Sequence, residues 1–312
     1  GDDTISGNGG CDVLNGDAGN DRLDGGDGDD YLHGFDGDDV LDGGAGDDLL
    51  RGGYGLNELR GGDGNDVLED PVSAAGGILD GGAGDDVLSG RDGASFIGGS
   101  GNDNISIAYS GLSTNSGTVA GGGGDDVFNI EYMARADGNP VSGGAGLDTY
   151  VLNGPHSRIS YYVIGDFAPG AGGDRIDVDA LLLDRSANPF APGGNLRLIV
   201  DGADTVLEWR SSPADAFQPR IRLANVSVAE LTSANFFGGI DPMGGTAELT
   251  LTGTAADDVL DGMSFNDKLY GLSGSDTIHG NAGDDHVEGG DEPGAGDLLF
   301  GRDRELTELT NL

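Results

Sequence analysis

The sequence predicts an all-β fold in which two blocks of stacked parallel strands flank a β-rich domain. Three observations support this prediction. A nine-residue unit repeats without insertion or deletion from Gly1 to Glu69. Each full unit opens with a glycine-rich turn and then places an acid at its sixth position and a large apolar residue at its eighth. Similar units return after residue 252, whereas the segment between the two blocks has less glycine and more proline and aromatic residues.

The unit explains how such a chain folds. In a three-residue strand after the acid, side chains alternate between faces, so only the eighth residue points inward and one apolar side chain per unit lines a narrow core. The six residues before the strand reverse the chain, which favours glycine because positive φ angles carry no steric penalty without a Cβ. If two units make one turn of a flattened coil, each residue lies over the residue eighteen positions later.

This stacking brings acids together in two columns. One column contains Asp12, Asp30, Asp48 and Asp66, and the other contains Asp3, Asp21, Asp39 and Asn57. Carboxylates about 4.8 Å apart, the spacing of neighbouring strands, repel each other unless a cation lies between them. Ca²⁺ accepts six to eight oxygen ligands, whereas Mg²⁺ requires near-ideal octahedral geometry and releases its waters reluctantly. The columns therefore predict several bound calcium ions.

The unit also resembles a known repeat. Segments such as GGAGDDLLR, residues 43–51, match the pattern GGxGxDxUx of the RTX (repeats-in-toxin) calcium-binding proteins. The resemblance implies a right-handed parallel β-roll in which calcium binds between consecutive turns through the sixth-position aspartate. It also implies a secreted bacterial protein that leaves the cell by the type I pathway.

The period continues past Glu69 with interruptions. A two-residue slip occurs at Asp70 and Pro71, and two later units lack the acid, with Gly77 in its place in the first of them. We expect residues 107–120 and 130–140 to be loops that leave the roll, arising from tolerated drift or forming a partner-binding face. The remaining units of this block supply four more candidate calcium ligands, namely Asp86, Asp103, Asp126 and Asp148.

The middle of the chain resembles the C-terminal region of serralysin-type secreted proteins. The phrases that match are YVIGDFAPGAGGDRIDVDALL, DGADTVLEW and RIRLANVSVAELTSANFF. The resemblance implies a cap, which a solenoid needs because its last turn otherwise exposes unpaired strand edges. We expect strands at 158–167, 196–200, 204–209 and 220–226 and a short helix at 228–237. Asp166, Asp174 and Asp177 are either turn-capping acids or ligands of a further calcium ion.

The repeats resume after a short alternating strand. Five acids hold the sixth position there, namely Asp258, Asp267, Asp276, Asp285 and Asp297. This block is shorter and has less glycine, so we expect weaker calcium binding. The predicted domains are thus a roll at 1–152, a cap at 153–245, a second roll block at 246–304 and a tail at 305–312.

Composition limits the partners. The formal charge of -41, from 56 acidic and 15 basic residues, argues against nucleic acid and against direct attraction to an anionic membrane. No apolar run approaches the roughly 20 residues of a membrane span. Cys11 is the only cysteine, so no internal disulfide is expected. Bound calcium reduces the negative charge and could bridge to anionic cell-surface glycans. Because Gly1 opens inside a repeat, we expect a fragment or processed product.

The sequence contains none of the motifs that mark common catalytic sites. HExxH, GxSxG, GxxxxGK[ST] and the EF-hand loop are all absent, so we expect no enzymatic activity. The leading prediction is a calcium-dependent structural module of a secreted surface or matrix protein, of the surface-layer or RTX adhesin class, which interacts with the type I secretion machinery and with glycans or other copies of itself. One alternative is the C-terminal secretion and stability module of an exported protease, lipase or epimerase. Another alternative is a calcium-dependent carbohydrate-binding module.

Overall fold

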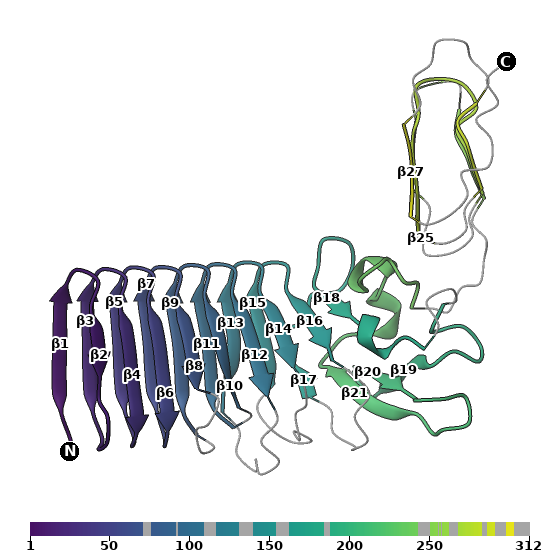
Figure 1. Cartoon of the computed structure of the whole chain (residues 1–312). Helices are drawn as coiled ribbons and strands as arrows, with labels where there is room; N and C mark the ends of the chain where they lie inside the picture. Colours follow the sequence, from purple (N-terminus) through teal and green to yellow (C-terminus); the bar gives the residue numbers. More distant parts are fainter. Residues whose placement is uncertain are drawn as a thin grey trace.

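A computed structural model gives the fold. It describes residues 1–70, 76–91, 93–108, 117–130, 140–153, 162–183 and 188–242 of the first block and the following domain. In the C-terminal repeats it describes residues 250–254, 256, 258–261, 268–282, 286–290 and 298–302. The described residues form an all-β structure in which the only helices are three short 3-10 turns (Figure 1). No helix in these ranges is long and apolar enough to cross a membrane.

The first block is a parallel β-solenoid with two repeats per turn. Odd-numbered strands stack in one sheet and even-numbered strands in the other, and every pairing within the block is parallel. The register confirms the eighteen-residue turn, since Ile5 pairs with Leu23 and Leu14 pairs with Leu32. The strands are β1 Thr4–Gly9, β2 Val13–Asn15, β3 Arg22–Asp27, β4 Tyr31–Asp36, β5 Val40–Ala45, β6 Leu49–Tyr54, β7 Glu58–Asp63, β8 Val67–Asp70, β9 Ile78–Ala83, β10 Val87–Arg91, β11 Ser95–Ser100, β12 Asn104–Ala108, β13 Val119–Gly123, β14 Val127–Ile130, β15 Val141–Ala145 and β16 Thr149–Leu152.

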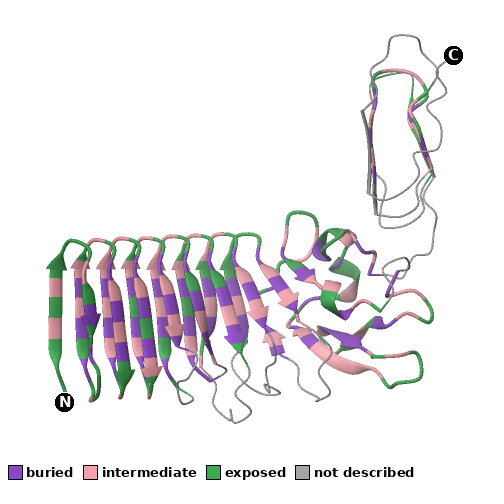
Figure 2. Ribbon diagram, viewed as in Figure 1, coloured by how far each residue is buried: buried purple, intermediate pink, exposed green. Residues whose placement is uncertain are grey.

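Most strands of this block are longer than the three residues that the sequence predicts. Strand β3, for example, has six residues and continues through the first three positions of the following unit. Its burial alternates, so Leu23 at the eighth position and Gly25 at the next first position both face the interior. Figure 2 shows buried segments alternating with less buried ones along the strands of the roll. The inward first position was not predicted, and it places a side-chain-free surface beside the core.

The core is a single column of apolar residues that widens along the solenoid. Leucines such as Leu32 and Leu50 are fully buried in the early turns. Aromatic residues replace them later, and the rings of Phe128 and Tyr150 stack with centroids 5.1 Å apart.

The two edges of the solenoid differ. We call the turns that lead from odd to even strands the first edge and those that lead from even to odd strands the second edge. Residues 71–75, 109–116 and 131–139, each of which follows an even strand and precedes an odd strand in the sequence, lie outside the described residues. The predicted insertions at 107–120 and 130–140 therefore lie only partly within the described chain. Ile107 and Ile130, where they begin, are buried strand residues rather than loop residues, because they fill inward first positions with apolar side chains.

The domain after the first block continues its sheets. Strand β17 pairs in parallel with β15, β18 pairs with β16, and an antiparallel set of three strands, β21, β20 and β19, extends the larger sheet beyond β17. The predicted helix at 228–237 is instead two 3-10 turns. The elements are β17 Tyr162–Ile164, β18 Arg175–Asp177, η1 Asp179–Leu181, β19 Leu196–Asp201, β20 Asp204–Trp209, β21 Gln218–Leu223, η2 Val228–Glu230 and η3 Ser233–Asn235.

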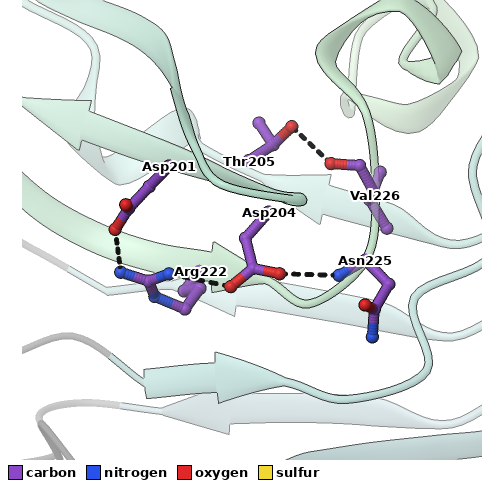
Figure 3. Close-up of polar contacts among 6 residues, drawn as sticks. All are labelled: Asp201, Asp204, Thr205, Arg222, Asn225 and Val226. Atoms are coloured by element: carbon purple, nitrogen blue, oxygen red, sulfur yellow. Dashed lines mark hydrogen bonds and ion pairs between the residues drawn. The ribbon is translucent and has the colours of Figure 1, made fainter.

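A polar cluster links the β19–β20 turn to the C-terminal end of β21 (Figure 3). The Arg222 guanidinium donates to Asp204 Oδ2 at 2.8 Å and also to Asp201. The Asn225 backbone N–H donates to Asp204 Oδ1 at 2.9 Å, and the buried Thr205 hydroxyl donates to the Val226 carbonyl at 2.6 Å. The backbone hydrogen bond from Asn225 and the bond from Arg222 hold the pKa of Asp204 below its usual range.

The C-terminal repeats form a separate pair of three-stranded parallel sheets. Their order is β22-β24-β26 and β23-β25-β27, so strands again alternate between two sheets. Leu269 and Ile278 are fully buried and form a small core with Val287. The strands are β22 Thr250–Thr252, β23 Val259–Asp261, β24 Lys268–Tyr270, β25 Thr277–Ala282, β26 His286–Glu288 and β27 Leu298–Arg302.

Candidate metal centres

The sixth-position acids form two hydrogen-bonded ladders, one on each edge. In each ladder the backbone N–H of one aspartate donates to Oδ1 of the aspartate one turn later, for example Asp12 to Asp30 at 2.7 Å. The first aspartate ladder, on the first edge, contains Asp12, Asp30, Asp48, Asp66, Asp86, Asp103, Asp126, Asp148 and Asp174. The second aspartate ladder, on the second edge, contains Asp3, Asp21, Asp39 and Asn57.

The other carboxylate oxygen faces a small space that we call the cradle. A Cβ added to the first-position Gly7 would lie 2.6 Å from Asp12 Oδ2 and 2.6 Å from the carbonyl oxygen of Gly25, one turn later. The same arrangement recurs turn after turn, for example around Gly43 with Asp48 and Gly61. First-position glycine is therefore required because any side chain would fill the cradle.

The cradles contain buried acceptors that no protein donor satisfies. Oδ2 is buried and has no hydrogen-bond partner in nine ladder residues, Asp12, Asp21, Asp30, Asp39, Asp48, Asp66, Asp86, Asp103 and Asp126. Leaving an ionised oxygen in this state costs free energy unless a cation compensates it. Each cradle also offers a glycine carbonyl oxygen, and carboxylate with carbonyl oxygen is the ligand set that calcium prefers. The residues present therefore fit calcium.

The ligands of a cradle are not side chains alone. Among the described residues, no three His, Cys, Asp or Glu side chains gather into one metal-binding group. The aspartates instead lie in a row along each edge, so that each turn of a ladder contributes one sixth-position carboxylate to its edge. Backbone carbonyls must supply much of the remaining coordination, which explains why the repeat specifies glycine turns as strictly as it specifies the acid.

Burial changes the acidity of the ladder carboxylates. Removal from water is the largest effect and raises the pKa of Asp48 and Asp66 to about 6 and the pKa of Asp86 and Asp126 to about 7. The backbone hydrogen bond to each carboxylate partly opposes this rise, and neighbouring aspartates add to it. A calcium ion in the cradle would stabilise the ionised form and reverse the shift.

The first ladder ends in the domain after the roll. Asp174 Oδ1 accepts the Asp148 backbone N–H at 3.1 Å, and its Oδ2 accepts the Ala168 backbone N–H at 2.8 Å. Asp166 accepts the backbone N–H groups of Gly143 and Gly144, both at 3.1 Å. Of the three acids considered for a further ion, Asp174 thus joins the ladder, Asp166 accepts from the backbone of β15, and Asp177 accepts the Asp179 N–H.

The sequence did not single out Asp70 as a site residue. It is fully buried at the end of β8, at a first position where the neighbouring turns have glycine, and Asn57 Nδ2 donates to its Oδ1 at 3.1 Å. Counting nine residues from the first-position Gly61 places Asp70 at the next first position. The two-residue interruption of the repeat at Asp70 and Pro71 hides this replacement of glycine in the sequence.

The C-terminal repeats keep the same geometry where they are described. The Asp258 N–H donates to Asp276 Oδ1 at 2.9 Å, and a Cβ on Gly253 would lie 2.7 Å from Asp258 Oδ2. In this turn, Thr254 also donates to Asp258 Oδ2 through its backbone N–H, at 2.6 Å. The other three predicted ligands lie outside the described residues, namely Asp267, Asp285 and Asp297.

Comparison with known families agrees with this geometry. A family profile described as the RTX calcium-binding nonapeptide repeat matches in four copies, at residues 1–32, 33–68, 76–105 and 261–292. These four segments are RTX calcium-binding repeats. RTX repeats bind several calcium ions and form a structural fold, and they are typical of secreted proteins.

Other comparisons add little to the RTX assignment. Comparison with curated proteins gives no match. Among solved structures, the extracellular lipase LipA from Serratia marcescens is similar at 22% identity with a TM-score of 0.22. The alignment covers 73% of this chain and 40% of the lipase chain, so this chain aligns with less than half of the lipase.

Proposed function

We propose that this chain is a calcium-folded structural module of a secreted bacterial surface or matrix protein, of the surface-layer or RTX adhesin class. In this proposal the module performs no catalysis, and its sixth-position aspartates are the calcium ligands. The chain stays unfolded where calcium is scarce and folds after export. Its partners are calcium, the type I secretion machinery and either anionic glycans or other copies of itself.

The row of unsatisfied Oδ2 atoms carries the proposal. The folded roll places carboxylate oxygens in buried cradles, one turn apart, where no protein donor compensates them. A chain with formal charge -41 adds long-range repulsion to this local cost. The glycines add a further cost, since glycine loses more conformational freedom on folding than any other residue. Folding therefore requires an external source of positive charge.

Calcium supplies that charge in proportion to its concentration. For a dissociation constant of about 10⁻⁴ M and about tenfold more calcium outside the cell, each bound ion contributes about 1.4 kcal/mol. The contribution disappears where calcium is far below the dissociation constant. Because the cradles stack in continuous rows, the ordering of one turn positions the ligands of the next, and we expect cooperative folding.

A calcium titration tests the proposal. Circular dichroism of the calcium-free chain at neutral pH should show little β structure, and millimolar Ca²⁺ should restore it with a sigmoidal dependence. Millimolar Mg²⁺ serves as the matched control and should have much less effect, because the irregular oxygen set of a cradle fits its octahedral preference poorly. A spectrum that is the same with and without calcium would contradict the proposal.

A further inference from the structure

The second ladder changes its chemistry at Asn57. Its Oδ1 accepts the Asp39 backbone N–H at 3.0 Å, as the aspartate Oδ1 atoms do in other turns. This hydrogen bond fixes the orientation of the amide, so that Nδ2 takes the position that Oδ2 has elsewhere. Asn57 is buried, and its cradle therefore contains an N–H donor in place of an unsatisfied oxygen.

Asp70 occupies the same cradle from the following turn. Arg51 in β6 pairs with Glu69 in β8, so the residues that follow them, Gly52 and Asp70, occupy equivalent first positions one turn apart. A Cβ on Gly52 would lie 2.6 Å from Asn57 Nδ2 and 2.7 Å from Asp70 Oδ1. Asp70 Oδ1 thus takes the place that the glycine carbonyl oxygen of the following turn has in other cradles, and the Asn57 amide donates to it at 3.1 Å.

We propose that Asn57 and Asp70 form a calcium-free closure that ends the second ladder. An amide N–H cannot ligate a cation, so this cradle does not fit calcium although its repeat belongs to the matched family segment at 33–68. The hydrogen bond from the Asn57 amide satisfies Asp70 Oδ1, where an ion would bind the oxygens of the other cradles. The inference rests on the proposed calcium binding by the other cradles, and it assigns which turn of the second edge is the last to need an ion.

The next turns of the second edge agree with this role. Gly90 pairs with Asp70 in the sheet, and a Cβ added to it would lie 3.1 Å from the ring of Phe96. The following first positions are filled by the buried side chains of Ile107 and Ile130. The closure therefore separates turns with acid-lined cradles from turns whose interior at this edge is apolar.

The number of bound ions tests the closure. Equilibrium dialysis with radioactive calcium at saturating concentration should give one more ion per chain for Asn57→Asp than for the wild type, because the cradle then contains two carboxylates. Asp70→Asn, the matched variant, removes the charge of the closure while keeping its size. It should bind as many ions as the wild type, because the wild-type cradle contains no ion to lose.

Each alternative result has a defined meaning. Loss of one ion in Asp70→Asn, or an unchanged count in folded Asn57→Asp, would overturn the closure. If Asn57→Asp does not fold, the count for Asp70→Asn decides alone. A wild-type chain that binds no calcium would contradict the proposed function but not the closure. In that case the closure is supported if Asn57→Asp alone acquires an ion, and it is overturned if Asn57→Asp acquires none.

Discussion

The two oxygens of each ladder carboxylate act differently. Oδ1 accepts a backbone N–H from the preceding turn and so fixes the side chain, while Oδ2 points into the cradle. A single aspartate therefore joins adjacent turns and presents a ligand oxygen in a defined direction. Because one oxygen is already satisfied within the protein, the side chain needs no ion to be oriented, and the cost that remains is that of the second oxygen.

Substitutions of two glycines in one turn test the cradle. A Cβ at Gly121 would overlap Asp126 Oδ2 and lie 2.6 Å from the Gly143 carbonyl, whereas a Cβ at Gly123 meets no atom within 4 Å. We expect Gly121→Ala to eliminate one calcium ion and to cost about 1.4 kcal/mol at tenfold excess of calcium over its dissociation constant. The calcium concentration at half-maximal folding should rise for Gly121→Ala and stay near the wild-type value for Gly123→Ala. Equal midpoints for the two variants would show that the cradle is not a ligand site.

Residue identities predicted the ladders but not every change along them. The eighteen-residue spacing placed Asp12 over Asp30 from the repeat alone, and the structure has this stacking. The role of Asp70 was missed because the sixth-position rule concerns acids before a strand, and Asp70 enters the interior from a glycine position at a strand end. The burial of Ile107 was missed for the same reason, since first positions were expected to belong to turns.

Second-position residues show how backbone geometry constrains the strands and turns. The second glycine of a unit has positive φ, as at Gly44 with 109°, and lies against the carbonyl of the preceding turn. Phe35 and Leu272 stand at second positions with φ of 75° and so adopt a conformation that costs an L-residue about 1–2 kcal/mol. The repeated hydrogen bonds between strands outweigh this cost. They also extend strand pairing into the first positions of each unit, which the sequence predicted to be turns.

The β20–β21 hairpin contains a charged cluster whose contribution can be measured. Asp204 accepts from both Arg222 and the Asn225 backbone, so Asp204→Asn should weaken two charge-assisted hydrogen bonds and lower stability by about 1–2 kcal/mol. Because the folded pKa of Asp204 is lowered, this stability is present above the unfolded pKa near 3.8 and is lost as pH falls through the folded value.

A second aspartate on the same hairpin provides the control. Asp215 accepts hydrogen bonds from Ser211 and Ser212 in the exposed connection between β20 and β21. Chemical denaturation at saturating calcium should show a smaller change for Asp215→Asn than for Asp204→Asn. A larger loss for Asp215→Asn would mean that the connection, and not the Arg222 cluster, stabilises the hairpin.

For the whole molecule, pH and calcium act on the same carboxylates. The folded pKa values of Asp48 and Asp86 are raised from 3.8 to about 6 and about 7, so the calcium-free fold binds protons more tightly than the unfolded chain. Its stability is therefore greatest below pH 3.8 and falls as pH rises through 6 to 7. We expect the calcium-free chain to gain β signal in circular dichroism as pH is lowered from 7.5 to 5.

Calcium should reverse the pH dependence. At saturating calcium the ionised carboxylates are stabilised, so folding should be complete at pH 7.5, and the calcium midpoint should rise on acidification because protons compete for the same oxygens. A calcium-free chain that remains equally unfolded at pH 5 and pH 7.5 would show that burial of these carboxylates is not what opposes folding.

For the whole molecule, the sequence predicted the parallel solenoid but not the difference between its two edges. Regular spacing of Leu14, Leu32 and Leu50 was sufficient for a parallel solenoid, because period and burial follow directly from the repeat. The unequal edges could not be predicted, since the same glycine-rich pattern describes both. Their difference depends on which turns contain buried residues such as Ile130, and that emerges only when strand register is known.

The unequal edges have a mechanical consequence. Towards the end of the roll, the first edge still has buried carboxylate oxygens without a protein donor, such as Asp126 Oδ2, whereas apolar side chains such as Ile107, Ile130 and Leu152 pack at the second edge. The two edges should therefore respond differently when calcium is removed. When calcium is withdrawn, we therefore expect unfolding to begin along the first edge and the apolar packing at Ile107, Ile130 and Leu152 to be the last part of the roll to separate.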